Sequence, residues 1–263
     1  MQIFRATIRL TVILLFSVWV VIIFCLGLPI CWIRKGWRTS WKNMWMSTWS
    51  RLLARIIGLN IRIEGPKPTP PFLLVSNHLS YVDILPFWAY LKTTFIAKSE
   101  VRGWPAIGWV AQLMGVLFID RNNKRDLIRV NKRLARNINE RQGVTLFPEG
   151  TSSKGKKVLP FLSSLLYYPA SQKIPVYHAA VAYEVPNNSM HEAWNEICWW
   201  GDMEFFPHLW NLLKIPSFSV HIRFGERAIV NSDRKLLAQA LRQEVMEIFE
   251  PTYKKTKKSG END

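Results

Sequence analysis

Acidic residues are scarce in this chain, and the first 63 of its 263 residues contain none. The whole chain has 19 Asp and Glu residues against 35 Lys and Arg residues, which gives a net charge of +16. Such a basic surface needs an anionic partner, and anionic membrane lipids attract basic side chains near the bilayer surface. We expect no nucleic-acid partner, because the basic residues are spread along the chain and no nucleic-acid-binding motif is present.

Cysteine is rare as well, with three residues in the chain. Cys25, Cys31 and Cys198 have neither the spacing of a zinc site nor that of a disulfide framework. We therefore expect reduced cysteines that pack against apolar neighbours, and neither a metal site nor a bound cofactor.

Charged residues are absent from residues 10–33, a segment of 24 residues. It is long enough to cross a hydrocarbon core of about 30 Å as a helix, and longer than the apolar region of a cleaved signal peptide, about 7–15 residues. Pro29 near its end leaves a kink or a re-entrant path open. We expect the protein to be bound to the cytoplasmic (inner) membrane. Because more basic residues follow this segment than precede it, we expect the remaining chain to face the cytoplasm.

Residues 40–59 carry an apolar stripe at helical spacing. The stripe consists of Trp41, Trp45, Trp49, Leu52, Leu53 and Ile56, and the basic residues Lys42, Arg51 and Arg55 lie off it. Such a helix suits the headgroup boundary of a membrane, but it equally suits packing on a folded domain. Residues 186–216 are also rich in aromatic residues, which predicts contact with membrane, a wall of an acyl-chain tunnel, or plain core packing.

After residue 60 the sequence alternates between short apolar runs and helical patterns. Strands are expected at residues 61–64, 72–76, 93–98, 116–120, 144–147, 174–184 and 219–224. Helices are expected at residues 80–91, 104–114 and 124–141, and from Asp233 onward. This pattern predicts an α/β fold, a central mixed sheet flanked by helices, preceded by a hydrophobic helix and an amphipathic helix. We expect membrane-associated helices in residues 1–60 and one α/β domain in residues 61–263.

His78 follows the apolar residues 72–75 and precedes Asp83 by five positions. A histidine at the end of a strand lies in an exposed corner, where a neighbouring carboxylate can orient the imidazole and make it a base. Asp83 also ends a capping-box pattern that begins at Ser80, so covering backbone amides at a helix start is an alternative role for it.

A second signature, residues 147–151 (Phe-Pro-Glu-Gly-Thr), ends another apolar strand. Together with the His78 and Asp83 pair it resembles the glycerolipid acyltransferase family, whose bacterial members acylate lysophosphatidic acid and similar lyso-lipids. The family has four sequence blocks, and the other two match residues 115–121 and 174–176. The resemblance covers roughly residues 72–183.

The resemblance implies that His78 is the general base and Asp83 its partner, with acyl-CoA or acyl carrier protein as the acyl donor. It assigns the lyso-phospholipid acceptor to Arg121, Phe118, Glu149, Gly150 and Thr151. Arg121 suits the phosphate of the acceptor, because arginine binds phosphate through two parallel hydrogen bonds. The alternatives are a solvated Arg121 and a simple turn at residues 148–150.

The leading hypothesis for function is an acyltransferase of phospholipid biosynthesis that makes phosphatidic acid from lysophosphatidic acid. Lysophosphatidate acyltransferases commonly have an arginine after the threonine of the third block, whereas Ser152 stands here. The same chemistry on another lyso-lipid, such as lyso-ornithine lipid, is therefore the second hypothesis. A membrane-binding or lipid-binding protein without catalysis is the third.

Overall fold

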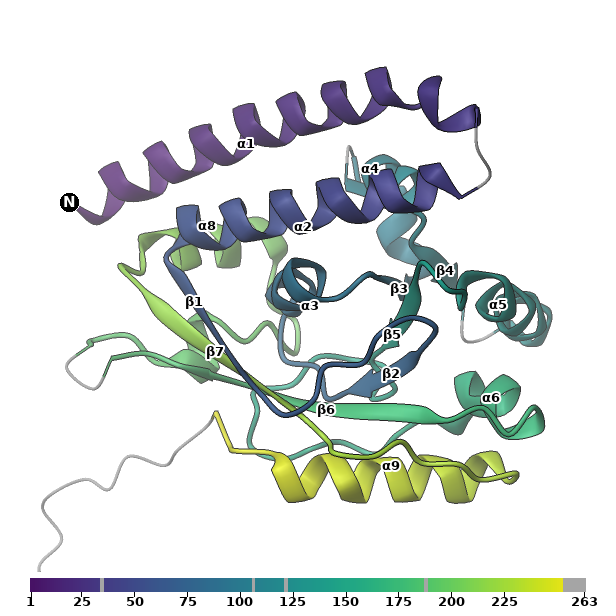
Figure 1. The fold of residues 1–263 in the computed structure, drawn as a ribbon. Coiled ribbons are helices and arrows are strands. Elements are labelled where there is room, and N and C mark those ends of the chain that lie inside the picture. The colour runs from purple at the N-terminus through teal and green to yellow at the C-terminus, as the bar shows by residue number, and fades with distance from the viewer. Residues whose placement is uncertain (34–35, 106, 121–122, 187–188, 253–263) are drawn as a thin grey trace, which may run out of the picture.

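The computed structural model describes residues 1–33, 36–105, 107–120, 123–186 and 189–252. A seven-stranded sheet with the order β1-β7-β6-β2-β5-β3-β4 forms its centre (Figure 1). Neighbouring strands are parallel except β6 and β7, so the predicted mixed sheet is confirmed. Each strand begins and ends within two residues of the range expected from sequence. The strands are β1 (Leu59–Glu64), β2 (Leu73–Ser76), β3 (Thr93–Lys98), β4 (Leu117–Ile119), β5 (Gly143–Leu146), β6 (Val176–Glu184) and β7 (Phe218–Phe224).

Helices cover both faces of the sheet. One face carries α2 (Trp37–Ile57), α3 (Ile84–Tyr90) and α8 (Phe205–Lys214), and the other carries α5 (Lys124–Asn137), α6 (Tyr167–Ser171) and α9 (Arg234–Ile248). Alternate side chains of a strand point to opposite faces, so Leu74 packs into the first core while Leu73 and Val75 pack into the second.

Shorter elements connect these layers. They are α4 (Ile107–Leu113), α7 (Ala193–Glu196), and the 3-10 helices η1 (Ile30–Trp32), η2 (Tyr81–Asp83), η3 (Ser99–Gly103) and η4 (Ser163–Leu166).

The N-terminal helix α1 (Gln2–Gly27) runs antiparallel to α2 and covers its tryptophan stripe (Figure 1). The indole of Trp41 donates to the Phe24 carbonyl at 3.1 Å, and that of Trp49 donates to the Ser17 hydroxyl at 3.0 Å. Gly27 permits this close approach, because a Cβ atom there would lie 2.3 Å from the Trp41 ring. The tryptophan stripe therefore packs on protein.

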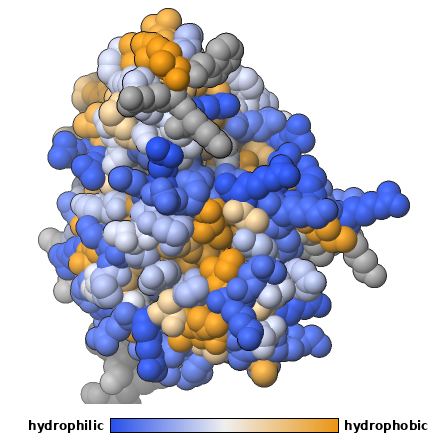
Figure 2. All heavy atoms as spheres, turned by 45° about the vertical axis from the view of Figure 1, so that its right-hand side comes forward, coloured by the Kyte–Doolittle hydropathy of each residue, from blue (hydrophilic) through white to orange (hydrophobic). Residues whose placement is uncertain are grey.

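The opposite side of α1 is an apolar surface. Its exposed residues include Ile3, Phe4, Ile8, Val12, Leu15, Val18, Trp19, Ile22 and Leu26. In Figure 2 hydrophobic residues gather at the top of the molecule, where α1 lies in Figure 1. Within the described ranges, α1 is the one helix that is long and apolar enough to cross a membrane by length and composition.

Two arginines tie α1 to the folded domain. Arg5 donates to the Lys214 carbonyl at 2.8 Å, and Arg9 donates to the Pro216 carbonyl at 2.9 Å. Lys214 is the last residue of α8, where helix carbonyls have no partner within the helix, and Pro216 follows two residues later. Consequently α1 lies along the domain instead of projecting from it.

Lys42 departs from its expected position on the polar side of α2. Its side chain is buried and its ammonium group donates to Oε1 of Gln142. Burial lowers the pKa of Lys42 to about 7, because the charged ammonium loses its hydration. Sequence periodicity missed this position, since the helix has protein on two sides, α1 and the sheet domain.

Candidate active site

The segment that follows β2 is fixed by its first side chain. Asn77 is buried, and its amide donates to the Val181 carbonyl at 2.9 Å and accepts from the Val181 amide at 2.7 Å. These two bonds continue the pairing of β2 with β6 by one residue after the strand ends. As a result His78 is held at the carboxyl end of a central strand.

The structure brings His78 and Asp83 into contact. Nδ1 of His78 lies 2.7 Å from Oδ2 of Asp83, whose side chain is fully buried, while the His78 side chain is 23% exposed. The imidazole stacks on the ring of Phe147, with 4.3 Å between ring centroids. Because Nδ1 faces the carboxylate, Nε2 is the ring nitrogen that can accept a proton.

The Asp83 carboxylate also accepts three further hydrogen bonds. Its Oδ2 accepts from the Leu79 amide at 2.8 Å and from the Ser80 amide at 3.1 Å, and its Oδ1 accepts from the Tyr183 hydroxyl at 2.7 Å. The capping box between Ser80 and Asp83 is present. Asp83 therefore caps the helix start and orients His78 at once. The two amides that it binds are not available to an oxyanion.

Tyr183 is a site residue that sequence reasoning missed. It is the second-last residue of β6, the strand that begins in the fourth block, and its side chain is fully buried on the same face of β6 as Val181. Burial, and then the negative charge of Asp83, raise the pKa of Tyr183, so its hydroxyl keeps the proton that it donates. Its backbone amide donates to the hydroxyl of Thr252 at 2.9 Å, which ties the chain after α9 to the site.

Glu149 is a buried carboxyl close to the His78 loop. Its Oε1 accepts from the Leu159 amide at 3.1 Å, and its Oε2 has no hydrogen-bond partner among the described residues. Burial raises the pKa of Glu149 to about 8, so the group carries a proton at neutral pH. Gly150 has a φ of +80°, which only glycine adopts readily, and Thr151 is exposed.

The first and third sequence blocks are joined through the backbone. The Ser153 amide donates to the His78 carbonyl at 3.0 Å. The Ser152 hydroxyl donates to the Trp199 carbonyl, and the Trp199 amide donates to the Leu79 carbonyl at 2.8 Å. The aromatic segment 186–216 thus packs beside the His78 loop through Trp199, with both blocks as its neighbours.

One predicted acceptor residue, Phe118, is not joined to this cluster. Phe118 lies on β4, three strands from β2, where its carbonyl accepts from Arg129 at 3.3 Å. Arg121 lies outside the described residues. Within the described ranges no three His, Cys, Asp or Glu side chains come together as candidate metal ligands.

Comparisons with known proteins place the chain in a family. Residues 60–182 match the protein-family model described as Acyltransferase. The chain is 32% identical over 230 residues to the lyso-ornithine lipid O-acyltransferase of Brucella abortus, a match that covers 83% of this chain and 85% of that protein. It is 33% identical over 132 residues to the 1-acyl-sn-glycerol-3-phosphate acyltransferase of Neisseria gonorrhoeae, covering 50% of this chain and 52% of that protein.

The fold also occurs in a solved structure. The crystal structure of the 1-acyl-sn-glycerophosphate acyltransferase PlsC from Thermotoga maritima superposes with a TM-score of 0.61 at 19% identity, covering 94% of both chains. The fold is that of an α/β acyltransferase. This chain belongs to the acyltransferase family and is an acyltransferase, so the family resemblance noted in its sequence is confirmed.

Proposed function

We propose that this acyltransferase moves a fatty acyl group from a thioester to the hydroxyl of a lyso-lipid, with His78 as the general base. The observation that carries the proposal is the 2.7 Å contact between His78 and the buried Asp83. It orients the imidazole, and the His78 side chain is partly exposed, as a base that takes a proton from a substrate hydroxyl requires.

In the proposed reaction, His78 carries one proton from the acceptor hydroxyl to the leaving thiolate. Nε2 takes the hydroxyl proton as the acceptor oxygen attacks the thioester carbonyl, and Asp83 stabilises the imidazolium that forms. The tetrahedral intermediate then collapses, the carbon–sulfur bond breaks, and the imidazolium returns the proton to the leaving thiolate. The acylated lipid and a free thiol are the products.

Lyso-ornithine lipid is the acceptor that the relatives favour over lysophosphatidic acid. The Brucella abortus protein matches 83% of this chain, whereas the Neisseria gonorrhoeae protein matches 50%. Position 152 supports the same choice, since Ser152 stands where lysophosphatidate enzymes commonly have arginine and its hydroxyl is bonded to the Trp199 carbonyl. A lyso-ornithine lipid presents a carboxylate instead of a phosphate, and arginine binds either anion in a bidentate way.

The acceptor contacts proposed from the family resemblance are Arg121, Glu149 and Gly150. The protonated Glu149 can donate from its buried Oε2 to an acceptor oxygen, and the backbone at Gly150 permits close approach of a ligand. Acyl-CoA or acyl carrier protein would supply the thioester.

We place the enzyme on the cytoplasmic membrane through α1. Its packed side binds α2 and α8, and its exposed side is apolar along the helix. A helix with one packed side and one apolar side is suited to lie in the headgroup and acyl-chain boundary, where the basic N-terminal region also meets anionic lipid.

In the test, purified protein is incubated with a panel of lyso-lipids and with either labelled palmitoyl-CoA or labelled palmitoyl-acyl carrier protein. The products are resolved by mass spectrometry. We expect product on lyso-ornithine lipid at least about tenfold faster than on lysophosphatidic acid. Product mainly on lysophosphatidic acid would instead establish phosphatidic acid synthesis. No product on any acceptor, with lipid binding retained, would favour a non-catalytic lipid-binding protein.

A further inference from the structure

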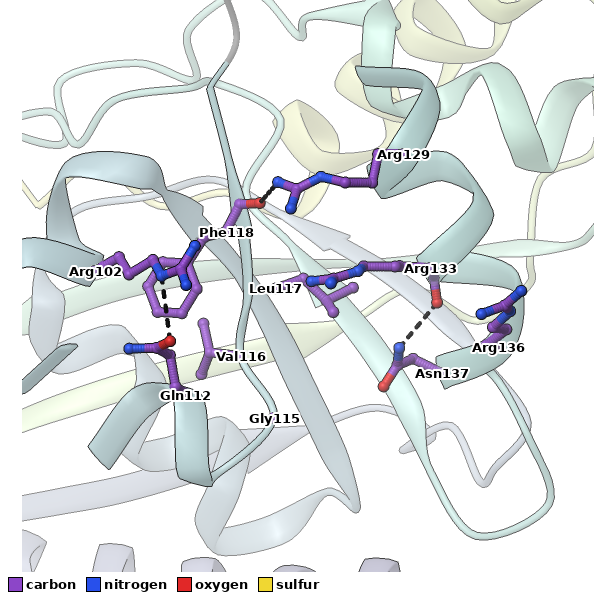
Figure 3. Close-up of a pocket in the computed structure, with 10 residues that line it drawn as sticks. All are labelled: Arg102, Gln112, Gly115, Val116, Leu117, Phe118, Arg129, Arg133, Arg136 and Asn137. Atoms are coloured by element: carbon purple, nitrogen blue, oxygen red, sulfur yellow. Dashed lines mark hydrogen bonds between the residues drawn. The ribbon is translucent and has the colours of Figure 1, made fainter. Parts of the chain in front are cut away.

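An open groove of about 460 Å³ runs along β4, the edge strand of the sheet (Figure 3). Its described residues come from η3, α4, β4 with the two residues before it, and α5, and they include four arginines and no acidic residue. The volume is in the range of small-molecule sites, about 300–1,000 Å³. The groove is separate from the His78 loop, and the proposed transfer mechanism does not use its arginines.

Three of the arginines form a ladder on α5. Arg129, Arg133 and Arg136 are four and three residues apart, so they lie on one face of the helix, and that face borders the groove. Arg102 of η3 lines the opposite side and donates to Gln112 at 3.2 Å. The two sides together present guanidinium groups to one space, a geometry suited to several phosphate groups.

The charge of the ladder is only partly compensated. Arg129 lies 2.7 Å from Asp126, one turn earlier on α5. Arg133 and Arg136 are exposed, and the lining residues other than the four arginines are uncharged. The groove therefore attracts anions, in agreement with the excess of basic residues in the chain.

The floor of the groove is apolar. Val116, Leu117 and Phe118 lie between the two arginine-bearing sides. A ligand that combines phosphates with a flat ring system suits both the arginine-bearing sides and the apolar floor, because guanidinium groups bind phosphate and also stack on rings. An acidic protein helix would use the arginines, but it would not fill a concave space.

The position of the groove relative to His78 suits an acyl donor. Residues near the carboxyl end of β4 lie on the same edge of the sheet as the end of β2, because both strands run parallel to β3 and β5. Three strand spacings of about 4.8 Å separate β4 from β2, roughly 14 Å across the sheet, and the lining residues 115–118 lie before the end of β4, which adds about 10 Å along the strand. An extended pantetheine arm can span that separation and bring a thioester to His78.

We propose that this groove binds the adenosine 3′,5′-bisphosphate end of a coenzyme A thioester, an inference that rests on the proposed acyl transfer. Arg129, Arg133 and Arg136 neutralise the phosphates, and the base lies on the apolar floor. The pantetheine arm then runs past the end of β4 toward His78.

The test combines a binding measurement with kinetics in detergent, where no anionic lipid competes. Adenosine 3′,5′-bisphosphate is titrated into the full-length protein by calorimetry, and the KM for palmitoyl-CoA is measured with a saturating acceptor. Arg133→Glu and the milder Arg133→Ala are compared with Lys132→Glu, which changes the exposed neighbour outside the groove. Thermal unfolding reports whether each variant is folded.

We expect Arg133→Glu to weaken bisphosphate binding and to raise the KM for palmitoyl-CoA about tenfold or more, with kcat and the acceptor KM within twofold of the parent. Lys132→Glu should change neither quantity beyond twofold. No bisphosphate binding to the parent, or equal losses in the two glutamate variants, would overturn the proposal. A KM increase that appears only with palmitoyl carrier protein would also overturn it, and would assign the ladder to a carrier protein. If the parent protein transfers no acyl group at all, the proposed function fails, and calorimetry still decides the groove.

Discussion

The Tyr183 hydroxyl donates a 2.7 Å hydrogen bond to Oδ1 of Asp83, and the other oxygen of the same carboxylate lies 2.7 Å from Nδ1 of His78. The three side chains form one chain of hydrogen bonds from the interior of β6 to a partly exposed imidazole. Because the tyrosine and the aspartate are both buried, the position of the carboxylate is fixed from the side opposite the substrate. In the proposed mechanism Tyr183 would act on the reaction through Asp83, as a positioning residue.

Tyr183→Phe should lower kcat about tenfold and leave both KM values within twofold, because Asp83 loses the bond that holds it while the substrate contacts remain. The free energy of unfolding should fall by about 1–3 kcal/mol, the usual effect of removing a partner from a buried polar group. Steady-state kinetics and urea unfolding measure the two quantities. Tyr177→Phe, which removes a hydroxyl from the same strand, is the control; equal kcat losses in both variants would contradict the positioning role.

His78→Ala should lower kcat by about 10²–10⁴-fold, the range supplied by a positioned general base, and should not change vesicle binding. Labelled acyl transfer and vesicle sedimentation measure the two effects. His191→Ala, which removes a histidine far along the chain, should keep its activity. Full activity in His78→Ala would eliminate the proposed base.

Glu149 should make the protein less stable as pH rises. Its pKa is raised from 4.5 to about 8 in the folded state, so between these values the folded protein binds a proton that the unfolded chain has released. The free energy of unfolding should therefore fall by up to about 1.4 kcal/mol for each pH unit in this window. Glu149→Gln should remove that slope in urea unfolding series at pH 5–8; an unchanged slope would mean that the carboxyl is ionised in the fold.

Lys42 should have the opposite effect in a higher pH window. Its pKa is lowered from 10.5 to about 7, so between these values the unfolded chain binds a proton that the folded protein does not. The free energy of unfolding should rise by up to about 1.4 kcal/mol for each pH unit. Lys42→Met should flatten this rise in unfolding series at pH 8–10, whereas a slope equal to that of the parent would place the charge on another group.

Single acidic substitutions on the exposed side of α1 should release the protein from membranes. Leu15 and Ile22 are 68% and 51% exposed, and either change to Asp should weaken vesicle binding at least about tenfold, since apolar burial in lipid is lost. Activity on detergent-dispersed substrate should persist. Leu236→Asp, at a 54% exposed position on α9, is the matched control, and equal losses of vesicle binding from α1 and α9 would argue against α1 as the anchor.

Local patterns predicted much of this fold. The strand ranges followed from short apolar runs, and the contact between His78 and Asp83 followed from a five-residue separation across one helix start. Such features depend on neighbours in the chain, so they can be predicted without knowledge of the topology. Even the two possible roles of Asp83 were visible, and the structure unites them.

Other features depend on which distant elements meet. The amino-acid sequence by itself determined the apolar first helix, the α/β alternation and a histidine paired with a nearby carboxylate. Only the tertiary structure decided that Tyr183 reaches Asp83 from 100 positions away, that Lys42 is buried against Gln142, and that the α5 arginines border an edge strand. The reason is that strand order and helix packing are set by burial summed over the whole chain, which no single segment records.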